Sequence, residues 1–529
     1  MSLDEKLAEL RARGDQPNLP LPPQWNPQFQ PRPYQRVGAL HLLFRKHFVL
    51  GDPTGTGKTF QELLSWAMLT SQRTAPMLVL TTKSAVRQWT EEAQRFLLPG
   101  TPILEQQTWS AKRRLARWQE WVELSQEQSA ILSVSWRTFV LDWPKLKDIL
   151  PPTLNRTQVV LDECQKIKNV KSQTHRVVRE MLRHADRVHG LTATLVKNMA
   201  HDAHAALLAI VPGMISTQLF EYRYCEFEWE MRPRKGGLRK TRILKGYKDL
   251  EDFKLRISPF YLGRTDRELG DERPEVQHIE RRFPMNPEHA KLYRDGEAGI
   301  FTMLDGQETP DYGAAVSHAQ ILCSAPELSI LYGEPDADVS CLSAKDNTKF
   351  EALEELLNTE LFGEPVIVYS PFERVIAHYC RNLKQHRPVK ITGKETDDDR
   401  NKARKAFMSG ETQLLFISDA GGEGLNLQVS CNLIFLSRPW DCGRYVQIVG
   451  RVRRFGSEHS KVNIWHLTCQ NSIDELVDAV VVDKFGPFEV IVQERGGLMP
   501  ETVTLPLDVA RETLRRRRRE HLRNRESLD

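Results

Sequence analysis

The stretch HFVLGDPTGTGKTFQELLSWAM, residues 47–68, decides the fold of this chain. It opens with a short apolar run from His47 to Leu50, which predicts a buried strand, and a glycine-rich turn follows. Apolar residues then recur at helical spacing, at Phe60, Leu63, Leu64, Ala67 and Met68. A strand, a glycine-rich turn and a helix in this order form the context that a phosphate-binding loop requires.

The turn carries residue types that suit a nucleotide. Gly55 and Gly57 let the backbone bend so that its N–H groups point inward, and the start of the next helix adds partial positive charge. Lys58 can reach the β- and γ-phosphates of ATP, and Thr59 can offer its hydroxyl to Mg²⁺. The general pattern GxxxxGK[ST] fails at one position, where Asp52 replaces the first glycine. The residues expected to bind the nucleotide here are Asp52, Gly55, Thr56, Gly57, Lys58 and Thr59.

A pair of carboxylates strengthens this interpretation. QVVLDECQ places Asp162 and Glu163 directly after an apolar run, at the edge of a parallel sheet where such folds bind ligands. Asp162 can hold Mg²⁺, and Glu163 can orient the water that attacks the γ-phosphate. The alternative is a surface Asp-Glu pair without a function. The position of the pair about a hundred residues after a phosphate loop favours the catalytic interpretation.

Composition sets broad limits. The chain has 529 residues, enough for about three or four folded units. Its first residues are charged, and no apolar run approaches the roughly 18 residues that span a bilayer. We therefore expect a cytoplasmic protein, associated with the nucleoid or, for a viral protein, in the host cytoplasm. The eight cysteines form no CxxC pair, which favours reduced thiols and no structural zinc.

Short apolar runs alternate with helical patterns in two regions of the chain. This alternation predicts an α/β fold with two RecA-like, doubly wound parallel-sheet lobes and a helical insertion between them. Seven prolines between Pro17 and Pro33 favour an extended, poorly packed lead-in. The predicted divisions are a lead-in at 1–33, a first lobe at 34–220, the insertion and linker at 221–345, a second lobe at 346–490 and a basic tail at 491–529.

Further motifs follow in order along the chain. They are PRPYQRVGALHLL from Pro31, LVLTTKSAVRQW from Leu78, ILSVSWRTF from Ile131, LDECQKIKNVKSQTHR from Leu161, PVIVYSPF from Pro365, KITGKETDDDR from Lys390, FISDAGGEGLNLQ from Phe416 and YVQIVGRVRRFGS from Tyr445. This set resembles the helicases of superfamily two, specifically the Swi/Snf-related ATPases that translocate on duplex DNA. The family often carries an aspartate such as Asp52 before its phosphate loop.

Two segments refine the resemblance. YRYC at 222–225 and FYLGRTDREL at 260–269 look like the region before the second lobe in the small annealing or fork-remodelling members. LTATLVKN at 191–198 departs from the usual LTGTP followed by QN. We therefore expect the hinge that couples hydrolysis to lobe movement to differ in detail from that of the family.

The resemblance also implies roles for individual residues. Tyr34 and Gln35 would lie on the adenine side of ATP, where an amide can make two contacts with the base edge. Gln447, Arg451 and Arg454 would come from the second lobe to the γ-phosphate, where an arginine neutralises transition-state charge. The alternative for these arginines is a basic surface cluster.

Polar residues at predicted strand ends are implied to grip one DNA strand through its phosphates. They are Thr81, Thr82, Lys83, Ser135, Ser370, Thr392, Gly393 and Ser418. Phosphate contacts hold the register of a duplex without reading its sequence, although each of these residues could instead cap a helix. The basic segment 232–248 is a candidate secondary DNA contact or a solvated loop. The arginine-rich end at 511–529 could neutralise phosphates or be a solvated helix end.

Three functions are consistent with these features. The first is an ATP-driven translocase on duplex or branched DNA, without sequence preference, that remodels DNA or protein–DNA complexes. The second is a strand-separating DNA helicase or an RNA-dependent ATPase on the same lobes. The third is a nucleic-acid-binding scaffold with an inactive ATPase, which the presence of Lys58, Asp162, Glu163, Arg451 and Arg454 argues against.

Overall fold

The structure is a computed structural model. It describes residues 20–106, 109–193, 195, 200–234, 237–264, 267–269, 274–305, 312–331, 344, 347–419, 427–439, 442–454, 457–475 and 477. The chain divides into two compact units, the first mainly Met1–Trp229 with Arg242–Gly270 and the second mainly Asp271–Gly486. No helix in the described part of the chain is long and apolar enough to cross a membrane.

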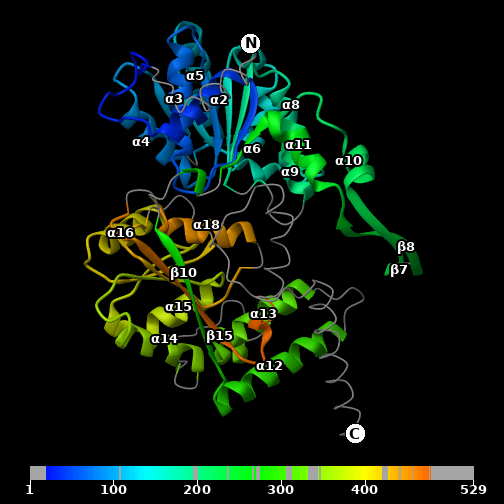
Figure 1. Ribbon diagram of the computed structural model, residues 1–529, viewed down its shortest axis with the longest axis vertical. Coiled ribbons are helices and arrows are strands. Elements are labelled where there is room, and N and C mark those ends of the chain that lie inside the picture. Colours follow the sequence, from blue (N-terminus) through cyan, green and yellow to red (C-terminus); the bar gives the residue numbers. More distant parts are fainter. Residues whose placement is uncertain are drawn as a thin grey trace. The chain divides into compact units, whose positions relative to one another are not determined.

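A seven-stranded sheet forms the centre of the first unit (Figure 1). Its order is β3 (Ile103–Gln106), β4 (Ile131–Ser135), β2 (Met77–Thr81), β5 (Gln158–Asp162), β6 (Arg187–Leu191), β1 (His47–Leu50) and β9 (Tyr261–Leu262). Every neighbouring pair is parallel. The carboxyl ends of these strands therefore meet at one edge of the sheet.

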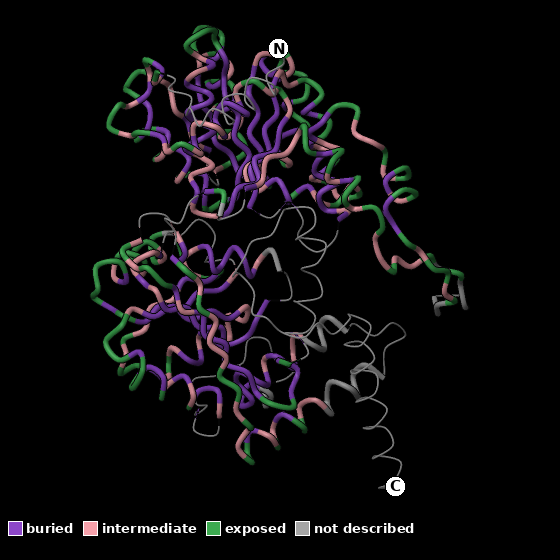
Figure 2. Tube along the Cα trace, in the orientation of Figure 1, coloured by how far each residue is buried: buried purple, intermediate pink, exposed green. Residues whose placement is uncertain are grey.

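Helices cover both faces of this sheet. The helices of the unit are α2 (Pro33–Phe44), α3 (Lys58–Thr70), α4 (Ala85–Phe96), α5 (Ala111–Glu127), α6 (Trp136–Leu146), α7 (Pro151–Leu154), α8 (Gln173–Leu182), α9 (Ala200–Ile210), α10 (Thr217–Tyr224) and α11 (Leu250–Ile257). Strands enclosed in this way read as continuous apolar runs, since both faces are buried. Met77, Leu78, Val79 and Leu80 of β2 are all fully buried, and Figure 2 shows the buried strands at the centre of the unit.

The second unit has a six-stranded sheet. Its order is β10 (Glu275–Phe283), β15 (Lys461–Cys469), β14 (Asn432–Phe435), β11 (Val366–Tyr369), β13 (Leu414–Ile417) and β12 (Val389–Ile391), again all parallel. Its helices include α12 (Pro287–Asp305), α13 (Tyr312–Ser324), α14 (Thr348–Asn358), α15 (Glu373–Asn382), α16 (Asp397–Met408) and α18 (Cys442–Val452). Two parallel α/β lobes confirm the predicted fold class.

The segment 221–345 differs from a purely helical insertion. It contains α11, α12 and α13, but also β7 (Cys225–Arg234), β8 (Gly237–Tyr247), β9 and β10. β9 pairs with β1 of the first sheet, and β10 pairs with β15 of the second. The sequence did not indicate these strands because β9 has only two residues and β10, EVQHIERRF, is a charged edge strand with no fully buried residue.

The described end of the lead-in is also better packed than its prolines suggested. Trp25 is only 2% exposed, its ring stacks on Phe96 at a centroid distance of 5.8 Å, and its edge meets Phe60 at 4.9 Å. The Trp25 indole N–H donates to the carbonyl of Phe29 at 2.8 Å. The expectation of a poorly packed lead-in is therefore wrong for this part, because one buried aromatic anchors it. The basic tail at 491–529 lies outside the described residues.

Candidate nucleotide site

The phosphate loop runs from the end of β1 to the start of α3, as predicted. Gly55 and Gly57 have φ angles of 80° and 74°, in the left-handed region that favours glycine. A Cβ atom on Gly57 would also lie 2.7 Å from Nε2 of Gln35. Both the backbone conformation and the close neighbour therefore require glycine before Lys58, the first residue of α3.

Lys58 folds back over this loop. Its Nζ donates to the backbone carbonyls of Asp52 at 2.8 Å and Pro53 at 3.0 Å. The Thr56 hydroxyl donates to the same Pro53 carbonyl at 2.9 Å. Thr59 lies half-buried in the first turn of α3. The loop thus holds its lysine and its hydroxyls within a few residues of one another, at a helix N-terminus.

Tyr34 and Gln35 contact the loop itself. The Tyr34 hydroxyl and the Gln35 amide both donate to the carbonyl of Thr56, at 3.2 and 3.1 Å. The other end of the Gln35 amide accepts from the backbone N–H of Arg32 at 2.9 Å. These contacts brace the phosphate loop from the N-terminal end of α2, and contact with adenine stays a prediction.

Asp52 forms a buried ion pair with Arg264, a residue that the sequence did not single out. Its carboxylate is fully buried and accepts from Nε of Arg264 at 2.9 Å and from a second guanidinium nitrogen. Arg264 also donates to the carbonyl of Tyr34 at 2.6 Å and to the side chain of Gln61 at 3.0 Å. Such bidentate geometry is the strong form of an Arg–carboxylate pair.

The surrounding backbone is built around this pair. A Cβ atom on Gly38 would lie 1.8 Å from Oε1 of Gln61 and 3.0 Å from Arg264. The N–H of Gly51 donates to the carbonyl of Leu262 in β9 at 2.6 Å. The segment that ends in Arg264 therefore closes one edge of the sheet and holds the start of the phosphate loop.

Asp162 and Glu163 lie at the carboxyl end of β5, as predicted. Oδ2 of Asp162 accepts from the Thr81 hydroxyl at 2.6 Å and from the Trp89 indole N–H at 2.9 Å. Burial, with the neighbouring Glu163 charge, raises the pKa of Asp162 to about 6. Glu163 has a φ of 57°, a conformation that non-glycine residues adopt mostly at functional or strained positions.

The residues assigned to DNA in the first unit share this edge. Thr81 of β2 pairs with Ser135 of β4 and, through its hydroxyl, contacts Asp162. Thr82 is buried and bonds Ser84 at 3.1 Å, whereas Lys83 is exposed. Ser135 caps α6 by accepting from the N–H of Thr138, so the alternative role considered for it is realised.

The corresponding residues of the second unit also share one edge. Ser370, Thr392 and Ser418 follow β11, β12 and β13, whose last residues are aligned. The Thr392 hydroxyl donates to Glu395 at 2.6 Å, and the Gly393 N–H donates to Glu373 at 2.7 Å. These groups and Ser418 are brought together as the sequence predicted, and most of them already hold the local loops in place.

Gln447 and Arg451 lie one turn apart on α18, and Arg454 follows the helix. The three therefore belong to one short segment of the second unit. The neighbouring Arg453, which the sequence analysis did not assign, is buried and donates to the carbonyl of Pro274 at 2.8 Å. Burial lowers the pKa of Arg453 to about 10. Arg453 therefore has a structural role, which the sequence pattern did not indicate: it holds the backbone at Pro274.

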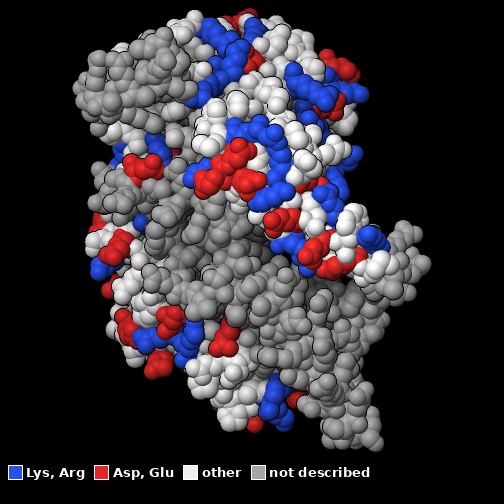
Figure 3. Space-filling view, turned by 45° about the vertical axis from the view of Figure 1, so that its right-hand side comes forward, with Lys and Arg blue, Asp and Glu red and all other residues white. Residues whose placement is uncertain are grey.

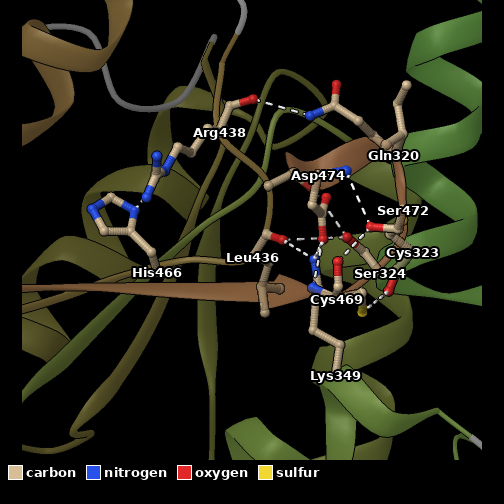
Figure 4. A network of polar contacts seen from close by, with 12 residues as sticks. Gln320, Cys323, Ser324, Lys349, Leu436, Arg438, His466, Cys469, Ser472 and Asp474 are labelled. Carbon is tan, nitrogen blue, oxygen red and sulfur yellow. Dashed lines mark hydrogen bonds and ion pairs between the residues drawn. The ribbon is translucent and has the colours of Figure 1, made fainter. Parts of the chain in front are cut away.

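A buried polar network holds the end of β14, which precedes α18 (Figure 4). Lys349 is fully buried, and its Nζ donates to the carbonyl of Leu436 at 2.7 Å and to Asp474 at 2.5 Å. Nε of Arg438 donates to Nδ1 of His466 at 2.8 Å. This network fixes the strand end from which the chain continues toward Gln447 and Arg451.

Parts of two motifs lie outside the described residues. They are 420–426 within FISDAGGEGLNLQ and several positions of LTATLVKN. The expected difference at the hinge therefore stays a prediction.

Two parallel α/β lobes, a phosphate loop at a helix N-terminus and paired carboxylates at the same sheet edge define a nucleotide hydrolase of the tandem RecA-like class. Residues 34–324 match the family described as SNF2-related domain, and residues 348–456 match the helicase conserved C-terminal domain. The chain belongs to the SNF2-related family, which confirms the expected class: a DNA-dependent ATPase of helicase superfamily two.

Individual proteins are similar at low identity. An uncharacterized ATP-dependent helicase of Bacillus subtilis, YqhH, is 22% identical, with 89% of this chain and 81% of the relative covered. The putative helicase/translocase YwqA of the same species is 23% identical, and the match covers 87% of this chain but only 49% of YwqA. Putative protein p41 of Acyrthosiphon pisum secondary endosymbiont phage 1 is 26% identical, with 85% and 95% covered.

Among solved structures, the Sulfolobus solfataricus SWI2/SNF2 ATPase core in complex with dsDNA is 20% identical to this chain. The match covers 91% of this chain and 96% of that one, with a TM-score of 0.40.

Proposed function

We propose that this protein hydrolyses ATP with Mg²⁺ and uses the energy to move along duplex DNA, without sequence preference, remodelling DNA or protein–DNA complexes. The loop from Gly51 to Thr59 would bind the phosphates. Its two left-handed glycines and the start of α3 support this role, since backbone N–H groups at a helix N-terminus suit an anion. Lys58 would exchange its two carbonyl contacts for phosphate oxygens.

Residues at the carboxyl edge of the sheet would bind the metal–nucleotide complex. Thr59 and Asp162 would hold Mg²⁺, which supplies positive charge against the β- and γ-phosphates when bound. The side-chain bonds from Thr81 and Trp89 fix the direction of the Asp162 carboxylate. Glu163, next in the chain, would orient the attacking water. Gln447, Arg451 and Arg454 would act on the γ-phosphate from the second unit, as the family resemblance implies.

One observation carries the proposed link between hydrolysis and DNA: the Thr81 hydroxyl donates to Asp162 at 2.6 Å. Thr81 ends β2, and the next residues, Thr82 and the exposed Lys83, are those assigned to a DNA strand. A DNA phosphate bound by Lys83 would lie two residues along the chain from Thr81, which contacts the metal-binding carboxylate of Asp162. DNA contact could therefore change the geometry of the catalytic edge without any long pathway.

The test is ATP turnover by the full chain with duplex DNA, single-stranded DNA, RNA or no nucleic acid. Strong stimulation by duplex DNA is expected. The Lys58→Ala variant should lose turnover under every condition, which shows that the measured activity belongs to this loop. Stimulation by RNA alone would contradict the proposal in favour of an RNA-dependent ATPase, and stimulation by single strands alone would favour a strand-tracking helicase.

A further inference from the structure

The hairpin of β7 and β8 has a surface that the nucleotide site does not use. Among the described strands, these two pair only with each other (Figure 1). Contacts near α10 anchor their base: the N–H of Lys248 donates to the carbonyl of Tyr224 at 3.0 Å, and Arg242 pairs with Glu221 at 3.0 Å. The base is thus fixed to the first unit.

Apolar residues occupy alternate positions along β7, so they share one face of the strand. Cys225 at the base is buried, and Phe227 is half-buried beneath the guanidinium of Arg242, 3.5 Å from its ring centroid. Further along, Trp229 is 61% exposed and Met231 is 60% exposed. This apolar row therefore changes from core to surface as it approaches the tip.

Charge changes along the same direction. Near the base, acidic residues of β7 balance basic residues of β8, as in the pair of Glu228 with Lys245 at 3.5 Å. Further along, the sequence from Met231 to Thr241 contains five basic residues, Arg232, Arg234, Lys235, Arg239 and Lys240, and no acidic one. On the described surface of the first unit in Figure 3, by contrast, basic and acidic side chains are interspersed.

An exposed indole beside a run of cations matches the chemistry of an unpaired nucleotide. Cations attract the phosphates, and an aromatic face stacks on a base of any sequence. The bases inside a duplex are already stacked on each other, so Trp229 would need a base that is outside the helix. A protein partner would account for the apolar row, but the five basic residues in the adjacent sequence favour a polyanion.

We propose that the β7–β8 hairpin binds unpaired DNA beside a duplex, such as the single-stranded arm of a fork, with Trp229 stacked on a base. This inference rests on the proposed function, because it takes DNA as the substrate, and it names branched DNA as the preferred form. The duplex that the motor moves along and the unpaired strand on the hairpin would then be two parts of the same DNA molecule.

The variant Trp229→Ala tests the stacking contact. Binding of the full chain to fluorescein-labelled forked DNA and to a blunt duplex of equal length would be measured by anisotropy. Loss of one base–aromatic stack should weaken fork binding roughly 5- to 150-fold, with little change for the blunt duplex. Trp229→Phe should retain most of the affinity, since it keeps an aromatic face. Phe362→Ala, at an aromatic residue 76% exposed in the second unit, is the matched control and should change neither affinity.

The double variant Arg239→Ser, Lys240→Ser tests the cations. Its salt slope for forked DNA should fall by about 1.4, since each phosphate contact to a single strand contributes about 0.7. ATP turnover without DNA should stay at the wild-type rate in all these variants.

The hairpin proposal would be overturned if Trp229→Ala weakened binding to forked DNA and to the blunt duplex equally. It would also be overturned if Trp229→Ala changed neither affinity, which is the result expected if the hairpin binds a protein. An unchanged salt slope would overturn it too. These outcomes are distinct from failure of the proposed function, which would appear as wild-type protein that duplex DNA does not stimulate.

Discussion

Replacing Arg264 with alanine removes the charge that faces Asp52 in the first unit. The Asp52 carboxylate is fully buried and accepts hydrogen bonds from the side chains of Arg264 and Gln61. After the change, only the bond from the Gln61 amide, at 3.1 Å, remains of these two. The variant therefore leaves a buried anion without its cation. This is more costly than the loss of a surface ion pair, because water cannot replace the missing partner.

The expected loss is about 3–5 kcal/mol, the usual effect of breaking a buried pair on one side. For a unit of this size, that loss corresponds to a decrease in melting temperature of roughly 6–20 °C. The double variant Asp52→Asn, Arg264→Gln should recover at least half of the loss, since it removes both charges and keeps polar side chains. Arg87→Ala is a control in the same unit: Arg87 and Glu91 are 69% and 61% exposed, and their separation should cost less than about 0.5 kcal/mol.

Scanning calorimetry of the four proteins measures these differences in the transition of the first unit. Steady-state ATP titration should also show a raised KM for Arg264→Lys, because a lysine keeps the charge but cannot make the paired contact with Asp52. A melting temperature of Arg264→Ala that matches that of Arg87→Ala would show that the buried pair does not stabilise the first unit. So would a double variant that is no more stable than the single one.

Three further changes test other parts of the site. Arg454→Ala should bind nucleotide normally but lose about 10³-fold or more in turnover, which nucleotide-binding and rate measurements would separate; undiminished hydrolysis would refute its assigned role. Thr81→Val removes the hydroxyl bonded to Asp162, and it should reduce stimulation by DNA more than basal turnover; equal reduction of both would count against the proposed link. Burial and the adjacent Arg438 cation hold the pKa of His466 well below its usual value. In the unfolded chain, His466 binds a proton near pH 6.5, whereas in the folded chain it stays neutral at that pH. The free energy of unfolding should therefore decrease as the pH falls below about 6.5. Melting temperatures at pH 7.5 and 5.5 should show this loss, and His466→Gln should show a smaller one.

The sequence was most informative where function depends on a short continuous stretch. Gly55 and Gly57 were predictable because a tight turn before a helix leaves few alternatives in residue type, and Lys58 was predictable because a phosphate loop carries a lysine after its last glycine. Asp162 was predictable because a run of apolar residues locates the strand before it. The two parallel sheets followed from the same alternation of strands and helices, repeated in both halves of the chain.

Contacts between distant segments could not be predicted in this way. Arg264 lies 212 residues from Asp52, and neither the apolar pattern nor the spacing of motifs indicates which charges pair. The bond from Trp89 to Asp162 is similar, since an indole in an apolar helix face is normally assigned to the core. β9 and β10 were missed because they are recognised as strands by their partners in the sheet rather than by their own sequences.

Movement of the protein along DNA can be measured by the displacement of a third strand from a duplex. A labelled oligonucleotide would be bound as a triplex at one end of a duplex, and its release followed after ATP is added to the full chain. We expect ATP-dependent release that Lys58→Ala abolishes and that is delayed as the duplex track is lengthened. Duplex-stimulated ATP hydrolysis without any release of the third strand would contradict movement along DNA.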